Sequence, residues 1–422
     1  MKIQRFTLGT VATMATLMST TALTAQDAET ITIGGLATLE GPFAGPGEDG
    51  LRGVELAIHE FGGEIAGHEI EMITASSDGN PDVALESARR LVQQDGVDIM
   101  VGPLSGSEGI RIAQYAREQP GTTFLNGGSA AIETTLVDPA ENFFRFNTEG
   151  AQWTAPLGGY VVNERGWDNI VIVSEDYSFP YAQIFGFMAT YCEAGGTVQD
   201  KYFTPVGNND YSSVIAQLPL EAGEVDGMYV VLGGSDAVNF LSQYAQSGGQ
   251  LPIVGGTNVT DQTVLTTQGP ARQLLPGILS SGPVSDNSDL QAWKDFVKLY
   301  QDYYGDEGLP SPSLFASNYY TNTKAALLAL QEVEGDLSDN HAALNEALRN
   351  LEFTSPTGTV SLNENRQATA AIYINEVVEQ DNGNLALEPL KRIEDVDQYL
   401  GLGREAYMEL GLPSRENPSC PS

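Results

Sequence analysis

The segment VDIMVGPLSGSEGI, residues 97–110, decides the fold of this protein. Its first half has the composition of a buried strand. This strand ends at Gly102, and small and polar residues then lead into a helical pattern that starts at Ile110. The segment TTFLNGGSAAI, residues 122–132, repeats this arrangement further along the chain. Strands that pass through glycine and serine into a helix are expected at the carboxyl edge of a parallel sheet.

Strand and helix patterns alternate on both sides of this segment, as parallel α/β folds require. In the first part of the chain, strands are expected at residues 31–36, 68–78, 97–102 and 122–127, and helices at residues 50–62, 80–96 and 107–119. After a joint near residues 143–150, strands are expected at residues 169–176, 197–203, 225–234 and 251–257, and helices at residues 153–166, 182–196, 211–223 and 235–248. A helix is expected at residues 313–333, and residues 368–380 are typical of an edge strand or a hairpin arm. The sequence therefore predicts an α/β protein with two doubly wound parallel-sheet lobes.

The first 25 residues are typical of a cleaved secretory signal peptide. Lys2 and Arg5 precede a long uncharged run of small residues that ends at Ala25. An uncleaved membrane anchor is the alternative, but this run is poor in strong hydrophobes, and no later stretch is apolar enough to span a bilayer. We therefore expect a chain that is exported.

The charge of the chain restricts its partners. It has 56 acidic and 20 basic residues, for a formal net charge of -36. Because phosphate contacts depend on lysine and arginine, this balance argues against nucleic acids and anionic membranes as partners. An anionic ligand would need hydrogen-bond donors that are organised locally.

The two cysteines, Cys192 and Cys420, form a pair that is free to oxidise in an exported protein. A disulfide between them would attach the C-terminal tail to the middle of the chain. The alternative is two separate thiols, which are unfavourable in an oxidising compartment.

Motifs for catalysis are missing from the sequence. The three histidines, His59, His68 and His341, show no metal-ligand spacing, so we expect no metal. The segment SGSEG has Ser105 where a nucleophile elbow requires glycine, and no phosphate-binding GxxxxGK[ST] motif occurs. We expect a protein that is not an enzyme and binds no cofactor.

Candidate binding residues in the first lobe follow two successive strands. Ser107 and Ser129 can donate hydroxyl hydrogen bonds, and the amides of Gly128 and Ala130 lie beside Ser129 in the chain. Glycine allows close approach of a ligand, and a helix N-terminus attracts a carboxylate. The other interpretation is that these serines only cap their helices.

Candidate residues in the second lobe also follow strands. They are Asp176, Tyr177 and Phe179 in the first such loop, Gly233, Gly234, Ser235 and Asp236 in the next, and Gly255, Gly256 and Thr257 in the last. Aromatic residues after a strand are often packing residues. Here they lie beside polar residues, which suits a cover over an apolar or aromatic part of a ligand.

Several long segments resemble the leucine/isoleucine/valine-binding family of type I periplasmic binding proteins of ABC transporters. They include ITIGGLATLEGPFAGPGEDGLRGVELAIHEFGG (residues 31–63), DGNPDVALESARRLVQQDGVDIMVGPLSGSEG (residues 78–109) and FTSPTGTVSLNENRQATAAIYI (residues 353–374). Each motif is weak alone, but the ordered set covers nearly the whole mature chain. The last forty residues resemble the family less.

The resemblance implies two lobes joined by three crossovers, with returns near GILSSGP (residues 277–283) and FTSPTGT (residues 353–359). The domains implied are residues 1–25 as signal peptide, 30–147 and 279–352 as lobe 1, 148–278 and 353–395 as lobe 2, and 396–422 as a C-terminal tail. Lobe 1 would hold a ligand carboxylate through Ser107, Gly128, Ser129 and Ala130, and Tyr177 and Phe179 would cover it.

The function implied is that of a periplasmic, monomeric solute-binding component of an ABC importer, which binds an amino acid of the branched-chain type or a similar small carboxylate and meets a membrane permease. One position departs from the family: a glutamate that pairs the ligand ammonium is replaced by Thr257. Asp236 or Asp176 is then the expected substitute, unless the ligand is an aromatic or other acid without an amino group. A ligand sensor for a membrane signalling partner is the other class of function that fits.

Overall fold

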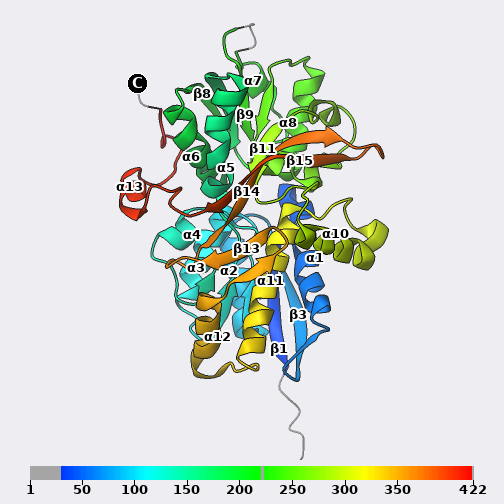
Figure 1. Ribbon diagram of the computed structural model, residues 1–422, viewed down its shortest axis with the longest axis vertical. Coiled ribbons are helices and arrows are strands. Elements are labelled where there is room, and N and C mark those ends of the chain that lie inside the picture. The colour runs from blue at the N-terminus through cyan, green and yellow to red at the C-terminus, as the bar shows by residue number, and fades with distance from the viewer. Residues whose placement is uncertain (1–29, 220–222, 421–422) are drawn as a thin grey trace, which may run out of the picture.

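The computed structural model describes residues 30–219 and 223–420, and the predicted signal peptide lies outside these residues. Two α/β lobes are stacked along the long axis of the molecule (Figure 1). Within the described residues, no helix is long and apolar enough to cross a membrane.

The first lobe contains a six-stranded sheet in the order β2-β3-β1-β4-β5-β6. Its strands are β1 (Ile31–Thr38), β2 (Glu64–Ile65), β3 (His68–Ser77), β4 (Ile99–Val101), β5 (Thr123–Leu125) and β6 (Phe143–Phe144). All pairs are parallel except β2 with β3. Alternate residues of β1 pack on opposite faces, because Ile31 and Ile33 join one apolar cluster and Leu36 joins another.

Helices cover both faces of this sheet. On one face lie α1 (Ala44–Glu60), α11 (Leu314–Glu332) and α12 (Ser338–Asn350), and on the other lie α2 (Pro81–Arg89) and α3 (Gly106–Ala116). The short helix α4 (Glu133–Leu136) follows β5, and α10 (Gln291–Tyr304) packs beside α1. The amphipathic spacing predicted for residues 50–62 and 313–333 therefore forms the contact of α1 with α11.

A nine-stranded sheet in the order β12-β13-β14-β11-β10-β9-β7-β8, with β15 paired to β14, forms the second lobe, but its end at β12, β13 and the start of β14 packs on the apolar cluster of the first lobe. Its strands are β7 (Asn169–Glu175), β8 (Thr197–Thr204), β9 (Gly227–Val231), β10 (Ile253–Gly255), β11 (Leu279–Gly282), β12 (Phe353–Ser355), β13 (Gly358–Leu362), β14 (Ala368–Glu379) and β15 (Leu385–Val396). The helices α5 (Gly150–Tyr160) and α6 (Ser178–Glu193) cover one face, and α7 (Ser212–Ile215), α8 (Gly234–Gln246) and α9 (Gln262–Leu265) cover the other.

Three details differ from the prediction. Residues 279–282 form β11 between β10 and β14, so the chain returns to lobe 1 after Gly282 and not at residue 279. Residues 368–380, expected as an edge strand or a hairpin arm, form β14. It is one arm of a hairpin with β15, which confirms that alternative, and β11 pairs with its other side, so it is not an edge strand. The helix expected over residues 211–223 is the short α7, with residues 220–222 outside the described part.

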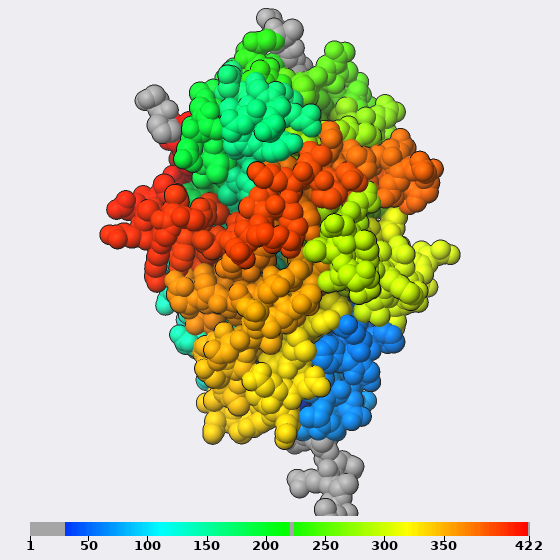
Figure 2. All heavy atoms as spheres, viewed as in Figure 1, coloured from blue at the N-terminus to red at the C-terminus, as the bar shows by residue number. Residues whose placement is uncertain are grey.

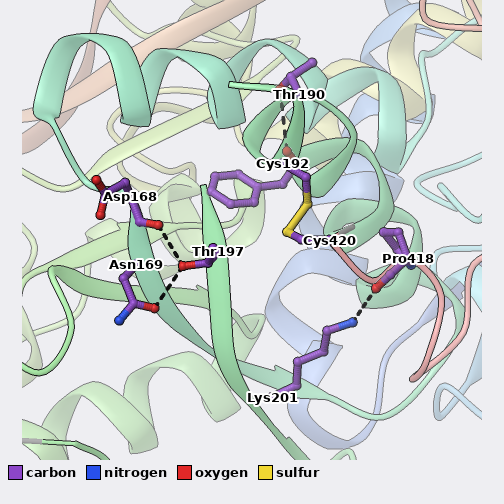
Figure 3. The surroundings of a disulfide bond; sticks show 9 residues. Asp168, Asn169, Thr190, Cys192, Thr197, Lys201, Pro418 and Cys420 are labelled. Atoms are coloured by element: carbon purple, nitrogen blue, oxygen red, sulfur yellow. Dashed lines mark hydrogen bonds between the residues drawn. A yellow bond between two sulfur atoms is a disulfide. The ribbon is translucent and has the colours of Figure 1, made fainter. Parts of the chain in front are cut away.

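The C-terminal segment after β15 lies at one side of the molecule, where the two lobes meet (red, left, in Figure 2). After β15, Tyr407 of α13 (Arg404–Glu409) packs with Ile132 and Leu136 of lobe 1 and with Phe185 of lobe 2. The segment ends beside α6, where Cys420 forms a disulfide with Cys192 and Lys201 donates a hydrogen bond to the Pro418 carbonyl (Figure 3). Of the two alternatives for the cysteines, the structure has the disulfide.

Candidate ligand-binding site

The carboxyl ends of the parallel strands of both sheets meet at a seam between the lobes. Three contacts define the seam, and each joins the first turn of a helix in one lobe to the first turn of a helix in the other. The Ser107 Oγ lies 3.0 Å from the Ser178 Oγ. A Cβ on Gly106 would lie 2.8 Å from the Phe179 Cβ, and a Cβ on Gly234 would lie 2.0 Å from the Pro42 carbonyl oxygen. The lobes are therefore closed on each other in this structure.

The first turn of α3 carries an internal carboxylate. The Glu108 carboxylate accepts hydrogen bonds from the Ser105 amide, the Gly79 amide and the Thr38 hydroxyl, and Ser105 caps the helix in return. Burial raises the pKa of Glu108, and these hydrogen bonds oppose the increase. The amides of Gly106 and Ser107 remain in the first turn, where a helix offers no acceptor of its own.

The second glycine-serine segment packs more tightly than the sequence suggested. The amides of Gly128 and Ser129 both donate to the Pro103 carbonyl, so they are engaged within lobe 1, contrary to the expectation that they face a ligand. The Ala130 carbonyl accepts from the Gly150 amide. The Ser129 Oγ is buried without a partner and lies over α3, since a Cβ on Gly109 would be 1.8 Å away. Ser107, which belongs to the first turn of α3, and Ser129, which packs on Gly109, therefore lie at the same end of α3.

Aromatic side chains from both lobes surround the seam. Tyr177 and Phe179 come from lobe 2, where Tyr177 directly precedes α6 and Phe179 lies in its first turn, and their ring centroids are 6.2 Å apart. Phe43, which follows β1 in lobe 1, lies 6.1 Å from Tyr177 and packs with Leu104 and Phe315. The sequence analysis missed Phe43 and Phe315. The position of Phe43 just after a strand in GPFAG is the signal that it overlooked.

Only part of the predicted lobe 2 set faces the seam. Gly234 has a φ of +49°, which glycine tolerates, and this brings it against Pro42. Ser235 is exposed, and Asp236 is buried with its Oδ2 2.6 Å from the Gly207 amide. Asp176 binds Arg415 of the C-terminal segment, so it is not the counter-charge proposed for a ligand ammonium.

The hydroxyl of Thr257, in the loop after β10, already has hydrogen-bond partners within lobe 2. The Thr257 hydroxyl donates to the Ser281 carbonyl at 2.6 Å and accepts from the Gln183 side-chain amide at 2.7 Å. Gly256 lies under the same Gln183 side chain, and Gly255 is buried against Ile278 and Thr260. Thr257 is therefore committed to contacts within lobe 2.

Glu175 is a buried carboxyl that the sequence analysis passed over in favour of Asp176. It is the last residue of β7, and its Oε1 accepts a hydrogen bond from the Gly233 amide at 3.2 Å. Burial, followed by the charge of Asp236, raises the pKa of Glu175 well above its usual value. The pKa of the Tyr177 phenol is also raised, by burial and then by Glu175, Glu108 and Asp236. Carboxyl groups from both lobes therefore surround Tyr177.

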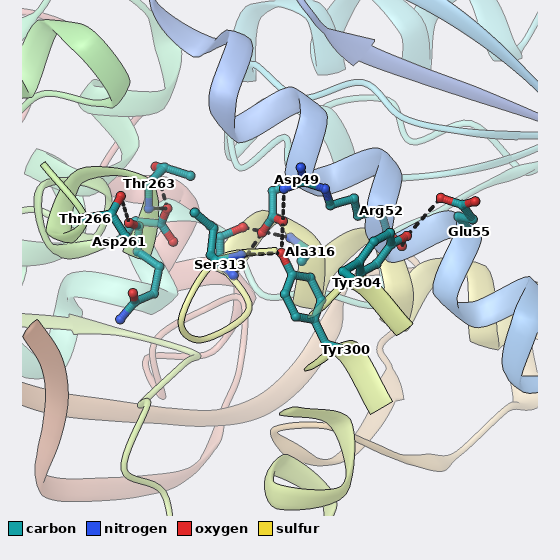
Figure 4. Close-up of polar contacts among 12 residues, drawn as sticks. Asp49, Arg52, Glu55, Asp261, Thr263, Thr266, Tyr300, Tyr304, Ser313 and Ala316 are labelled. Atoms are coloured by element: carbon teal, nitrogen blue, oxygen red, sulfur yellow. Dashed lines mark hydrogen bonds and ion pairs between the residues drawn. The ribbon is translucent and has the colours of Figure 1, made fainter. Parts of the chain in front are cut away.

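Two carboxylates hold the start of α11, which carries Phe315. Asp49 of α1 accepts from the Ser313 amide and from the Tyr300 hydroxyl, and Asp261 of lobe 2 accepts from the Leu314 amide (Figure 4). Since α11 belongs to lobe 1, the bond from Leu314 to Asp261 connects the lobes beside the seam. In the part of the chain that the structure describes, no group of three or more histidine, cysteine or acidic residues is arranged to hold a metal ion.

Two stacked α/β lobes with a seam at their strand ends are the architecture of a two-lobed binding protein. Comparisons with known proteins lead to the same class. A family model for periplasmic binding proteins matches residues 30–384. Leu/Ile/Val-binding protein homolog 8 of Brucella suis is 27% identical over 365 residues, which covers 82% of this chain and 87% of that protein. The chain belongs to the leucine/isoleucine/valine-binding family of periplasmic binding proteins, as the sequence resemblance indicated.

Solved structures share the fold. A solute binding protein of an ABC transporter from R. palustris, in complex with benzoate, has a TM-score of 0.77 at 23% identity and covers 87% of this chain and 98% of its own. The branched-chain amino acid transporter substrate binding protein of Streptococcus pneumoniae, in complex with isoleucine, has a TM-score of 0.73 at 19% identity and covers 86% of this chain and 99% of its own.

Proposed function

We propose that this chain is the periplasmic solute-binding component of an ABC importer and that it binds an amino acid or a similar small carboxylate between its lobes. The observation that carries the proposal is the contact of Ser107 with Ser178 across the seam, among Phe43, Tyr177 and Phe179. Both lobes thus contribute polar and aromatic groups to one place. The relatives solved with isoleucine and with benzoate support a small carboxylate as the ligand class.

The groups of the seam have complementary roles in this proposal. The ligand carboxylate binds at the first turn of α3, where the amides of Gly106 and Ser107 and the Ser107 hydroxyl are donors. The rings of Phe43, Tyr177 and Phe179 cover the apolar part of the ligand. Because a ligand held by both lobes stabilises the closed form, it shifts the population toward the conformation that a membrane permease would recognise.

Thermal unfolding of ligand-depleted protein tests this function. An acid that binds the folded state, present at a hundred times its Kd, adds about 2.7 kcal/mol to the free energy of unfolding and raises the Tm. Ser107→Ala should weaken binding about tenfold, because a hydrogen bond to a charged group is lost. Ser213→Ala, at an exposed position of α7, is the matched control and should not change the affinity. If no amino acid or small organic acid raises the Tm, the proposed function is wrong.

A further inference from the structure

The segment after β15, residues 397–420, forms a strap whose far end is fixed to lobe 2. It ends at Cys420, which is bonded to Cys192 of α6 (Figure 3). The carbonyl of Pro418 also accepts a hydrogen bond from Lys201 of β8 at 2.7 Å. The match to the family model ends at residue 384, so the strap is an addition to the part of the chain that the family shares.

One side chain in the middle of the strap is buried between the lobes. Of residues 401–410, Tyr407 alone is buried, at 1% exposure, and all the others are exposed. Its ring packs on Ile132 and Leu136 of lobe 1 and lies 5.8 Å, centroid to centroid, from the ring of Phe185 in lobe 2. The helix α13, which lies beside α4 and α6 in Figure 1, therefore attaches to the two lobes through a single aromatic residue.

A second contact joins the start of the strap to lobe 1. Gln398 is fully buried, and its Nε2 donates to the Thr135 hydroxyl of α4 at 3.1 Å. The same hydroxyl accepts from Arg145 and donates to Gln367, and both of these residues lie where the chain crosses between the lobes. The strap is therefore connected to lobe 1 and to the hydrogen bonds around the crossovers.

These contacts favour the arrangement in which the lobes are closed. If the lobes separate at this place, Tyr407 can remain with Phe185 of lobe 2 or with α4 of lobe 1, and its contacts on the other side are lost. Buried aromatic side chains are among the residues that contribute most to a packed interface. The strap therefore opposes opening of the lobes.

The covalent bond at its end keeps the strap in place. The strap has no apolar core of its own, because its large apolar side chains are exposed at Leu402, Met408, Leu410 and Leu412. The ion pair of Arg415 with Asp176 is partly exposed, and such pairs contribute little. A covalent tether, in contrast, holds Tyr407 at a high effective concentration beside its site.

We propose that residues 397–420 are a strap that holds the two lobes together, and that the Cys192–Cys420 disulfide controls this strap. In the oxidised protein the strap is fixed and closure is favoured. A dithiol reductant transfers two electrons and two protons to the disulfide, so that two thiols form and the reductant itself becomes a disulfide. The end of the strap is then released and the lobes open more readily. This role acts on the lobes themselves and goes beyond the proposed function.

Small-angle X-ray scattering of ligand-depleted protein measures the ratio of closed to open molecules. Tyr407→Ala, with the disulfide intact, should lower this ratio about tenfold, because the side chain between the lobes is lost. Tyr407→Phe should behave as the unaltered protein, since the Tyr407 hydroxyl has no hydrogen-bond partner among the described residues. Met408→Ala is the matched control, because Met408 is the next residue of α13 and is 43% exposed.

Reduction tests the disulfide on the unaltered chain. Dithiothreitol should also lower the ratio of closed to open molecules by about tenfold. The double variant Cys192→Ser, Cys420→Ser should show the lower ratio before treatment and should not respond to it. Far-UV circular dichroism checks that the compared proteins are folded, and the comparison of oxidised with reduced protein stands even where Tyr407→Ala fails to fold.

Two results would overturn the strap: scattering of folded Tyr407→Ala protein that matches the unaltered protein, or opening of Met408→Ala to the same extent as Tyr407→Ala. Opening by Tyr407→Ala without any effect of reduction would overturn the control by the disulfide.

Discussion

Tyr177 and Phe43 reach the seam from opposite lobes, and each is held by the chain geometry at the end of a strand. Tyr177 is half-buried and directly precedes α6, while Phe43 is 2% exposed and directly precedes α1. Side chains placed at the ends of rigid elements cost little entropy when a ligand orders them. Tyr177 is therefore well placed to contribute to binding while contributing little to folding.

Tyr177→Ala should weaken binding of ligands with apolar side chains by about tenfold, because a ring contact at the seam is lost. The Tm of the ligand-free protein should change little. Calorimetric titration and thermal unfolding measure the two effects. Tyr303→Ala, at an exposed tyrosine of α10, is the control. Equal affinities for the Tyr177 variant and the unaltered protein would remove Tyr177 from the site.

Asp261 shows how a single carboxyl can make stability depend on pH. Burial raises the pKa of Asp261 to about 6, although hydrogen bonds from Thr263 and Leu314 oppose the increase. In the unfolded chain an aspartate has a pKa near 3.9. Since the folded state holds the proton more tightly, this group stabilises the fold below about pH 4, and the contribution is lost as the pH rises to about 6.

Asp261→Asn should flatten the fall in the free energy of unfolding between about pH 4 and pH 6, by up to about 3 kcal/mol. Urea denaturation at several pH values measures it. Asp306→Asn, at an exposed position, is the control and should show the same fall as the unaltered protein. A curve for Asp261→Asn that runs parallel to the unaltered one would contradict the assignment.

At the scale of elements, the N-termini of α3 and α6 meet across the seam. Gly106 begins α3 in lobe 1, and Phe179 lies in the first turn of α6 in lobe 2. A Cβ on Gly106 would lie 2.8 Å from the Phe179 Cβ and 3.0 Å from the Phe179 amide nitrogen. Because the second of these atoms is backbone, the clash cannot be relieved by a side-chain rotation.

Gly106→Ala should therefore push the lobes apart and reduce ligand affinity without unfolding either lobe. X-ray scattering should show a larger radius of gyration in the presence of saturating ligand, and calorimetry should show weaker binding. Gly159→Ala in α5 is the control, because a Cβ there meets its nearest atom at an ordinary 3.7 Å. Scattering curves that coincide for the two variants would mean that α3 and α6 do not limit closure.

At the scale of the whole molecule, the segment after β15 connects parts that the two sheets leave separate. The family match ends at residue 384, so this segment lies beyond it. Tyr407 packs on both lobes, Arg415 binds Asp176 next to Tyr177, and Cys420 is bonded to Cys192. The disulfide closes a loop with a sequence separation of 228 residues. It holds the C-terminal segment against α6.

Replacing both cysteines by serine should lower the free energy of unfolding by about 2 to 5 kcal/mol, as expected for closure of a long loop. Urea denaturation of oxidised protein, reduced protein and the double variant measures the difference. Reducing agent should destabilise the natural chain and leave the double variant unchanged. Equal stability of oxidised and reduced protein would show that the other contacts of the segment suffice to hold it.

Prediction from the sequence succeeded where local patterns carry the information. The strand-to-helix order, the strand that passes through glycine and serine into a helix in residues 97–110, and the family resemblance all predicted the α/β lobes. Ser107 was predicted to face the other lobe, and it contacts Ser178 in the first turn of α6; its role in ligand binding stays a prediction. Glu175 and Phe43 were missed because adjacent residues at a strand end look equivalent in sequence, and only the direction of each side chain distinguishes them.

The sequence by itself determined the class of fold, because apolar periodicity and glycine-serine strand ends are local and depend on neighbouring residues. Only the tertiary structure decided that Asp176 turns to Arg415 while Glu175 turns to Gly233, that β11 stays in lobe 2, and that the C-terminal segment crosses both lobes. These outcomes depend on contacts between residues far apart in the chain, and their energies are set by burial and by partners that no local pattern contains.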